Sequence, residues 1–208
     1  MISAVIPAYN EADRIGQVIR ECFRYCDEVI VIDDGSIDNT AKEASKYGAK
    51  VIRNSSNKGY IYSIKRGFRA AAGDIVVTID ADGEHCPSDI PIITKPILYD
   101  QADIVLGARD KIDRISERLI SLIVRLKTGI RDSGTGFRAI KRSLALNLKY
   151  KGICICGISV LEPWLKGAHI LEIPIRLNSV DKKRKIAWGH IIQIFYVLLL
   201  IFKRKRFK

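Results

Sequence analysis

Short apolar runs alternate with segments of helical periodicity along most of the chain. Five runs rich in β-branched residues predict strands at 2–7, 27–33, 51–52, 75–79 and 104–108. Between these runs, apolar positions recur at helical spacing and predict helices at 12–23, 40–47, 60–72 and 87–98. This alternation is typical of an α/β fold with a mostly parallel central sheet and helices on both faces.

The second half of the chain has a less regular pattern. After a loop at 129–136, we expect an edge strand at 137–140, a short helix at 144–148 and a strand at 169–177. A helix predicted at 116–126 has Arg118 and Arg125 free to point away from the sheet. Its apolar residues are expected to pack on the sheet: Leu119, Ile120, Leu122, Ile123 and Leu126.

The 208 residues fit one domain, which we place at 1–180, followed by a tail at 181–208. The formal net charge is +12, and residues 182–208 hold nine Lys or Arg and no Asp or Glu. Such a basic excess is typical of proteins that bind nucleic acid, an anionic membrane or an anionic substrate. Nucleic acid is disfavoured because the aromatic residues of the tail lie inside an aliphatic run rather than between basic residues.

That aliphatic run, Ile191 to Phe202, has twelve residues, or about 18 Å as a helix, whereas a bilayer core takes about 20 residues. Two interpretations stay open: a helix packed on the domain or a partner, and an anchor in the membrane interface.

The chain has five cysteines with no zinc-ligand spacing: Cys22, Cys26, Cys86, Cys154 and Cys156. Cys22 and Cys26 are interpreted as small buried residues. Reduced thiols suit the cytosol, and the first residues lack the pattern of a secretion signal.

Polar motifs follow three of the predicted strands. Asp80, Asp82 and Glu84 come directly after the strand at 75–79, at the edge where open α/β sheets bind ligands. Three carboxylates held close together repel one another unless a cation lies between them, and the simplest is a hard divalent metal, Mg²⁺ or Mn²⁺. PAYNE (7–11) and DDGS (33–36) follow the first two strands. Alone, DDGS fits either an ordinary turn or a carboxylate that binds a ribose or a base.

Taken together, these motifs make the chain resemble the family 2 inverting glycosyltransferases with the GT-A fold, and among them the dolichyl-phosphate mannose or glucose synthases. The match covers roughly residues 1–177. It rests on Asn57 and Gly59 and on the segments PAYNE, VIVIDDGSIDNTA (29–41), GFRAAAGD (67–74), DADGEHCP (80–87), LGAR (106–109), DSGTGFRAIKR (132–142) and EIPIR (172–176).

The resemblance implies a role for each matched residue. The donor, GDP-mannose or UDP-glucose, would be bound by Pro7, Tyr9, Glu11, Asp34, Gly35, Asn57, Gly59 and Asp80. Mg²⁺ or Mn²⁺ would be held by Asp80, Asp82 and Glu84. With Asp82, the catalytic set would comprise three arginines that face the phosphate of a polyprenyl phosphate acceptor: Arg109, Arg118 and Arg138. The enzyme would lie at the cytosolic face of a membrane, as a peripheral protein.

Some positions depart from the family pattern. Glu84 stands where the family more often has Gln, and Ile61, flanked by Tyr60 and Tyr62, replaces a glycine. His85 either orients a ligand or is a plain loop residue.

Two other functions are compatible with the motifs. A family 2 transferase that acts on a sugar hydroxyl would need a carboxylate base, and no Glu-Asp pair after Gly107 supplies one. The other is a membrane protein that binds nucleotide-sugars without turnover.

Overall fold

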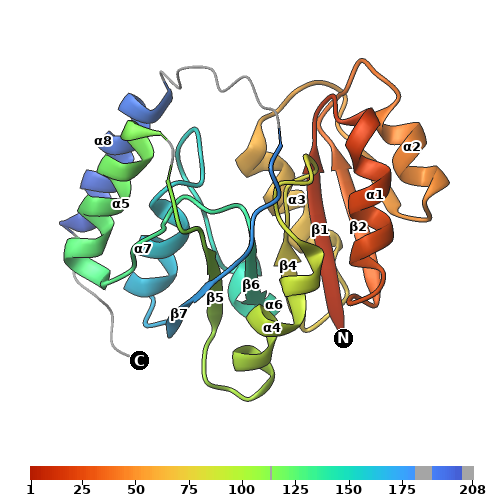
Figure 1. Cartoon of the computed structure of the whole chain (residues 1–208). Helices are drawn as coiled ribbons and strands as arrows, with labels where there is room; N and C mark the ends of the chain where they lie inside the picture. Colours follow the sequence, from red (N-terminus) through yellow and green to blue (C-terminus); the bar gives the residue numbers. More distant parts are fainter. Residues whose placement is uncertain (113, 181–188, 203–208) are drawn as a thin grey trace.

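A seven-stranded sheet runs through the centre of the molecule (Figure 1). The computed structural model describes residues 1–112, 114–180 and 189–202. The strand order is β3-β2-β1-β4-β6-β5-β7, and every neighbouring pair is parallel except the two that involve β6. The strands are β1 (Ile2–Ala8), β2 (Glu28–Asp33), β3 (Lys50–Arg53), β4 (Ile75–Thr78), β5 (Ile104–Ala108), β6 (Arg138–Lys141) and β7 (Ile170–Pro174).

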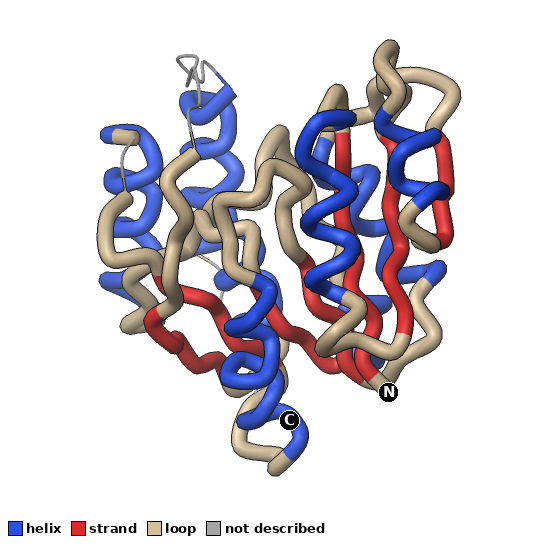
Figure 2. Tube along the Cα trace, turned by 45° about the vertical axis from the view of Figure 1, so that its right-hand side comes forward, coloured by secondary structure: helices blue, strands red, loops and turns tan. Residues whose placement is uncertain are grey.

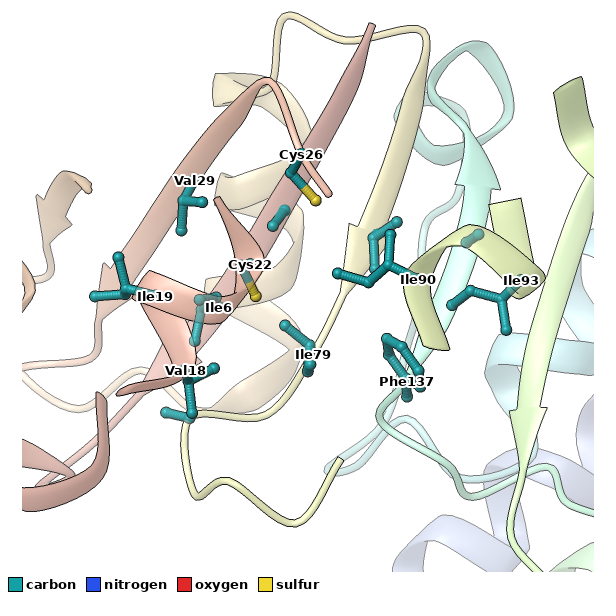
Figure 3. Close-up of a cluster of buried hydrophobic side chains, with 14 of the residues drawn as sticks. Ile6, Val18, Ile19, Cys22, Cys26, Val29, Ile79, Ile90, Ile93 and Phe137 are labelled. Carbon is teal, nitrogen blue, oxygen red and sulfur yellow. The ribbon is translucent and has the colours of Figure 1, made fainter. Parts of the chain in front are cut away.

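Helices cover both faces of this sheet (Figure 2). The helices are α1 (Ala12–Cys22), α2 (Thr40–Lys46), α3 (Tyr60–Ala70), α4 (Ile90–Leu98), α5 (Ile115–Thr128), α6 (Arg142–Leu146), α7 (Ile158–Leu165) and α8 (Gly189–Ile201), with a 3₁₀ turn, η1 (Pro87–Asp89), before α4. One buried cluster joins the sheet to α1, α2 and α4, and Figure 3 shows part of it. The other cluster joins the opposite face to α3, α5, α6, α7 and α8.

Burial on both faces explains the composition of the strands. In β2, Val29 and Val31 belong to one cluster while Ile30 and Ile32 belong to the other, because successive side chains of a strand point to opposite faces. Each such side chain stabilises the folded state by about 1.5–3 kcal/mol when it is fully buried. The β-branched runs of the sequence therefore match central strands, and the expected mostly parallel α/β sheet is confirmed.

One prediction about the second half of the sheet needs correction. The predicted edge strand at 137–140 is β6, which lies inside the sheet, antiparallel to both β4 and β5. Its four residues are too few to show the pattern of a central strand, and its charged residue, Arg138, is buried. The edge strand on this side is β7, and helix α7 was not predicted.

The prediction for α5 was partly wrong. Ile120 and Val124 are buried, whereas Leu119, Leu122 and Leu126 are exposed together with Ile115. At 3.6 residues per turn, positions 115, 119, 122 and 126 form one stripe of a helix, and positions 120 and 124 lie on another. Helix α5 therefore has two apolar faces, of which only one packs inward.

Helix α8 packs beside α5 and α7 (Figure 1). Its side chains His190, Gln193 and Val197 are buried. Ile194, Leu200 and Ile201 are partly buried against the cluster that includes α5 and α7, whereas other apolar side chains of α8, among them Phe195 and Leu199, are exposed. Among the described helices, none combines the length and the apolar character needed to cross a bilayer. The basic stretches 182–185 and 203–208, on which the predicted tail depends, lie outside the described residues.

Candidate functional site

The carboxyl ends of β2, β1 and β4 lie side by side at one edge of the sheet. These three strands are adjacent and parallel, with Ala8 opposite Asp33 and Val5 opposite Thr78. The motifs that follow them, PAYNE, DDGS and DADGE, therefore meet at this edge, as the sequence predicted.

The PAYNE segment is tied to the DDGS turn by side-chain hydrogen bonds. The backbone N–H of Asn10 donates to Ser36 Oγ at 3.0 Å, and the N–H of Ile37 donates to Asn10 Oδ1 at 2.9 Å. The N–H of Glu11 donates to Thr40 Oγ1 at 2.8 Å. These bonds fix the first segment of the site and leave the Tyr9 ring exposed at the surface, where a planar base could stack.

Asp34 organises the loop before α3. Its carboxylate accepts hydrogen bonds from Asn54 Nδ2 at 2.6 Å and from the backbone N–H groups of Lys58 and Gly59 at 2.9 and 2.8 Å. Gly35 has φ +76°, and a Cβ there would lie 2.7 Å from the carbonyl carbon of Ser56. Only glycine permits this close approach, which brings the DDGS turn against the loop that carries Asn57.

Asp80 is held by residues from two other segments. Its Oδ1 accepts a hydrogen bond from Tyr60 Oη at 3.1 Å, and the backbone of Gly136 lies directly against its carboxylate. Gly136 is fixed in turn because its carbonyl accepts a 2.7 Å hydrogen bond from Thr78 Oγ1. Tyr60, which the sequence marked only as a departure from the family pattern, is thus a direct partner of the acidic motif.

The rest of the acidic loop is ordered by backbone contacts. Asp82 Oδ1 accepts a hydrogen bond from the N–H of Glu84 at 2.9 Å. Asn178 covers this loop, because its N–H donates to the Glu84 carbonyl at 2.8 Å and its amide donates to the Gly83 carbonyl at 3.0 Å. No sequence signal pointed to Asn178. Asp82, Gly83 and His85 also line a cavity of about 620 Å³ between this loop and α1.

His85 is buried within this loop. Its Nδ1 lies 3.8 Å from Asp80 Oδ2, and neither ring nitrogen has a hydrogen-bond partner among the described residues. Burial lowers the pKa of His85 below its ordinary value, against the opposing charges of Asp80, Asp82 and Glu84. The neutral form of this imidazole is therefore favoured at neutral pH.

These side chains fit a hard divalent cation. The loop offers carboxylate oxygens, and the unpartnered His85 lies next to Asp80. The carboxylates of Asp80, Asp82 and Glu84 are not among the described groups of three ligand atoms that all lie within 4.8 Å of one another. One or two carboxylates suffice where substrate phosphates complete the coordination, as is usual for Mg²⁺.

Gly136→Ala is expected to displace the Asp80 carboxylate and lower activity by about 10²-fold, on the scale of losing one preorganised electrostatic contact. A Cβ at position 136 would lie 2.2 Å from Asp80 Oδ2, and the carboxylate must move because it is the more mobile group. Initial-rate assays measure the loss. In an Asp80→Ala background the same substitution should have no further effect, and a second full loss there would contradict this explanation.

Arg109 is engaged by two acidic residues. Its Nε and one terminal nitrogen donate to the two carboxylate oxygens of Asp132 at 2.8 and 2.9 Å, and the same terminal nitrogen donates to Glu117 at 3.2 Å. Burial alone would raise the pKa of Asp132, but the hydrogen bonds and charge of Arg109 outweigh burial and hold that pKa below its ordinary value. Arg109 thus has a structural role in this arrangement, and its predicted phosphate contact stays a prediction.

Asp132→Asn is expected to destabilise the protein by about 3–5 kcal/mol at neutral pH, because it leaves a buried guanidinium without its bidentate partner. A carboxyl group with a lowered folded-state pKa stabilises the fold fully above its unfolded pKa of about 3.9. That stabilisation is lost as the pH falls through the lower pKa that Asp132 has in the folded protein. Urea unfolding of both proteins between neutral and acidic pH should therefore give curves that converge in acid.

The control for this prediction is Asp100→Asn, which removes a surface ion pair with Lys141. It should change the free energy of unfolding by about 1 kcal/mol or less. A difference between Asp132→Asn and the parent that does not vary with pH would contradict the assignment.

The other two predicted arginines have different environments. Arg118 is exposed on α5, and its Nε donates to the Ile112 carbonyl at 2.5 Å. Arg138 is buried on β6, donates to the Thr135 carbonyl through a terminal nitrogen, and has no hydrogen-bond partner for Nε among the described residues. Burial and the charge of Asp80 raise the pKa of Tyr60, and the charge of Arg138 opposes this rise. Arg138 therefore lies near the acidic motif. Arg118 and Arg138 are not joined to one another by any contact that the described residues show.

Comparisons with known proteins agree with this geometry. The N-acetylglucosaminyltransferase of Methanococcus voltae that is named for UDP-N-acetylglucosamine and dolichyl phosphate is 30% identical, over 97% of this chain and 96% of that protein. The dolichol-phosphate mannosyltransferase of Pyrococcus furiosus is 30% identical, over 95% of this chain and 63% of that protein. Glucosyl-3-phosphoglycerate synthase from Mycobacterium tuberculosis, solved with Mn²⁺ and UDP-glucose, superposes with a TM-score of 0.76 at 25% identity, over 97% of this chain and 78% of that chain.

The resemblance inferred from the strand-end motifs is thereby confirmed, as is the GT-A fold. The model for glycosyl transferase family 2 matches residues 3–156, which include all three motifs and Arg138. The chain belongs to glycosyl transferase family 2, and it is a glycosyltransferase.

Proposed function

We propose that this glycosyltransferase moves a hexose, mannose or glucose, from a nucleotide-sugar to a polyprenyl phosphate with inversion at the anomeric carbon. The observation that carries the proposal is the adjacency of the β2, β1 and β4 ends, which brings Asp34, Tyr9 and Asp80 to one edge of the sheet. The likeness to transferases named for dolichyl or dolichol phosphate, over 96% of the length of one and 63% of the other, supports the acceptor class.

The nucleotide of the donor would lie over the PAYNE and DDGS segments. The exposed Tyr9 ring offers a stacking surface, and Pro7, Glu11, Gly35, Asn57 and Gly59 surround the same edge. The Asp34 carboxylate holds the loop that forms one wall. GDP-mannose and UDP-glucose are both candidate donors, as is the UDP-N-acetylglucosamine for which one relative is named.

The diphosphate of the donor would face the acidic loop. Asp80 and Asp82, with Glu84 beside them, would hold Mg²⁺ or Mn²⁺, which neutralises the charge that develops on the departing nucleoside diphosphate. Tyr60 and Gly136 orient Asp80, and the buried His85 lies beside it.

The charged residues proposed to face the acceptor suit an anionic nucleophile. A phosphate monoester attacks without a strong general base, and the nearby Asp132 is a poor proton acceptor because Arg109 lowers its pKa. Glu117 is also paired with Arg109. A sugar hydroxyl would need the base that these paired carboxylates do not supply. Arg138 and Arg118 are the arginines proposed to attract and orient the phosphate.

The function is tested by incubating the purified chain with each nucleotide-sugar, Mn²⁺, and either a short-chain polyprenyl phosphate or a free sugar. We expect a glycosyl phospholipid and release of the nucleoside diphosphate with one donor. Transfer to the sugar hydroxyl alone would favour the polysaccharide-type alternative, and nucleotide binding with no product would favour a non-catalytic protein. Both of those results would overturn the proposal.

We also propose that the enzyme lies at the cytosolic face of a membrane through α5 and α8. Helices α5 and α8 pack together, and both carry exposed apolar side chains: Ile115, Leu119, Leu122 and Leu126 on α5, and Ile191, Ile192, Phe195, Leu198 and Leu199 on α8, with Phe202 directly after it. Apolar faces of this extent are uncommon on monomeric proteins, and exposed Arg118 and Arg125 flank this one. An anionic bilayer surface matches both the apolar and the basic character.

His190, Gln193 and Val197 of α8 are buried against the domain. Helix α8 would therefore be part of the domain and would also contact the membrane, so the division into a domain at 1–180 and a separate tail is too simple.

Replacing Phe195 and Leu199 together by Glu is expected to lower binding to anionic liposomes by at least about tenfold, because two apolar anchors of roughly 1.5–3 kcal/mol each are lost. Both side chains are exposed, so the fold should remain. Co-sedimentation with anionic and neutral vesicles measures the effect, with Leu98→Glu on the exposed end of α4 as the control. Equal binding by the double variant and the control would contradict the membrane face.

A further inference from the structure

Two cysteines and a histidine meet where α8 joins the domain. Cys154 and Cys156 lie in the loop between α6 and α7, and His190 lies in the first turn of α8. One ligand atom from each of the three residues lies within 4.8 Å of the other two. Cys156 Sγ lies 4.0 Å from His190 Nε2, and the Cys154 and Cys156 sulfurs lie within 4.8 Å of each other. This is the one group of three possible metal ligands at that spacing among the described residues.

Neighbouring residues orient these side chains. Ser116 Oγ lies 2.6 Å from His190 Nδ1, so the Nδ1–H can donate to the hydroxyl and leave the Nε2 lone pair directed at Cys156. The buried Gln193 accepts from the N–H groups of Ile153 and Cys154 at 3.0 and 3.3 Å and donates to the Cys156 carbonyl at 2.9 Å. A hydrogen bond to the remote nitrogen of a histidine is the usual support of a metal-binding imidazole.

From this arrangement we propose that Cys154, Cys156 and His190 form a site for a soft divalent cation such as Zn²⁺, separate from the acidic loop. Two sulfurs and one imidazole nitrogen are the donor set that zinc prefers, and a solvent molecule would complete the tetrahedron. Donor atoms of a tetrahedral zinc site lie about 3.5–3.8 Å apart, so the 4.0 Å separation of Cys156 and His190 requires only a small contraction.

Bound Zn²⁺ would join α8 to the loop before α7 and, through Ser116, to α5. These are the two helices whose exposed faces carry the apolar surface described above. The ion would therefore stabilise the position of α8 on the domain. Of the three remaining cysteines, Cys22 and Cys26 are in the core, and burial raises the pKa of Cys26 to about 12, while Cys86 lies beside the acidic loop, where its Sγ donates to Asn178 Oδ1.

The site is tested with the full chain, reduced and freed of metal, by titration with Co²⁺ and then Zn²⁺. Cobalt bound by thiolates absorbs in the near ultraviolet, which separates this site from any carboxylate site. We expect one equivalent of Co²⁺ with the thiolate band, its displacement by Zn²⁺, and a higher melting temperature with Zn²⁺.

The variants Cys156→Ser and His190→Gln should each abolish the thiolate band or weaken binding by at least about 10²-fold, while Cys86→Ser and His169→Gln should leave it unchanged. Ser116→Ala keeps all three ligands and should weaken Zn²⁺ binding by about 10–100-fold. It therefore remains informative if a ligand variant fails to fold. Absence of the band in the parent, its survival in both ligand variants, full affinity in Ser116→Ala, or a Cys154–Cys156 disulfide in place of metal binding would overturn the proposal.

Discussion

Asp82→Asn is expected to lower turnover by about 10²–10³-fold while leaving the fold intact. Asp82 is almost fully buried in the acidic loop, and its Oδ1 accepts the N–H of Glu84. An asparagine has the same shape and keeps that acceptor, so the turn should persist. What it removes is the negative charge that would hold the divalent ion against the donor diphosphate.

Two measurements separate this explanation from a loss of structure. The variant should melt within a few degrees of the parent, and a higher Mn²⁺ concentration should be needed for half-maximal rate. Asp74→Asn is the matched control, because Asp74 is exposed and its side chain pairs with the N-terminal amine at the surface. Turnover equal to that of the parent would refute the metal assignment of this loop.

The strand-end motifs were predictable because their causes are local. A β-branched run predicts a buried strand, and in a parallel sheet the strand ends gather at one edge without further information. Asp33, Asp34 and Asp80 were placed correctly for this reason. The same reasoning could not give the partners of each carboxylate. Asp34 binds a loop 20 to 25 residues away in the chain, and Asp80 is held by Tyr60.

Tertiary contacts also decided what the downstream residues do. Arg109 matched a family motif, yet Asp132, which is 23 residues away, occupies one edge of its guanidinium. The cysteines showed no zinc-ligand spacing along the chain, and His190 joins Cys156 only because α8 folds back against the domain. Helix α5 was misjudged because its two apolar stripes were assigned to a single buried face. Periodicity indicates which residues share a stripe, but not which stripe is covered.

Arg138→Ala is expected to raise the KM for the polyprenyl phosphate by about 10–100-fold while changing the donor KM far less, since a hydrogen bond to a charged group contributes about 1.5–3 kcal/mol. Arg138 is 2% exposed, and its Nε has no hydrogen-bond partner among the described residues. A buried cation is costly to maintain, which favours a function for its charge. Arg138 lies opposite Thr78, two residues before Asp80, so its field acts on an anion at the same edge of the sheet.

Truncation of a buried arginine also leaves a cavity, so the charge must be tested apart from the volume. Arg138→Met keeps most of the side-chain length but removes the charge, so it should reproduce the increase in acceptor KM. Arg138→Lys retains the charge and should restore part of the affinity for the acceptor. The restoration is incomplete because lysine lacks the bidentate geometry of arginine. Arg69→Met, at an exposed position of α3, is the control and should leave both KM values unchanged. Steady-state kinetics with each substrate varied in turn distinguishes the cases. Equal increases in the donor and acceptor KM values for Arg138→Met would mean that the residue supports the fold of the site as a whole and does not act on the acceptor phosphate.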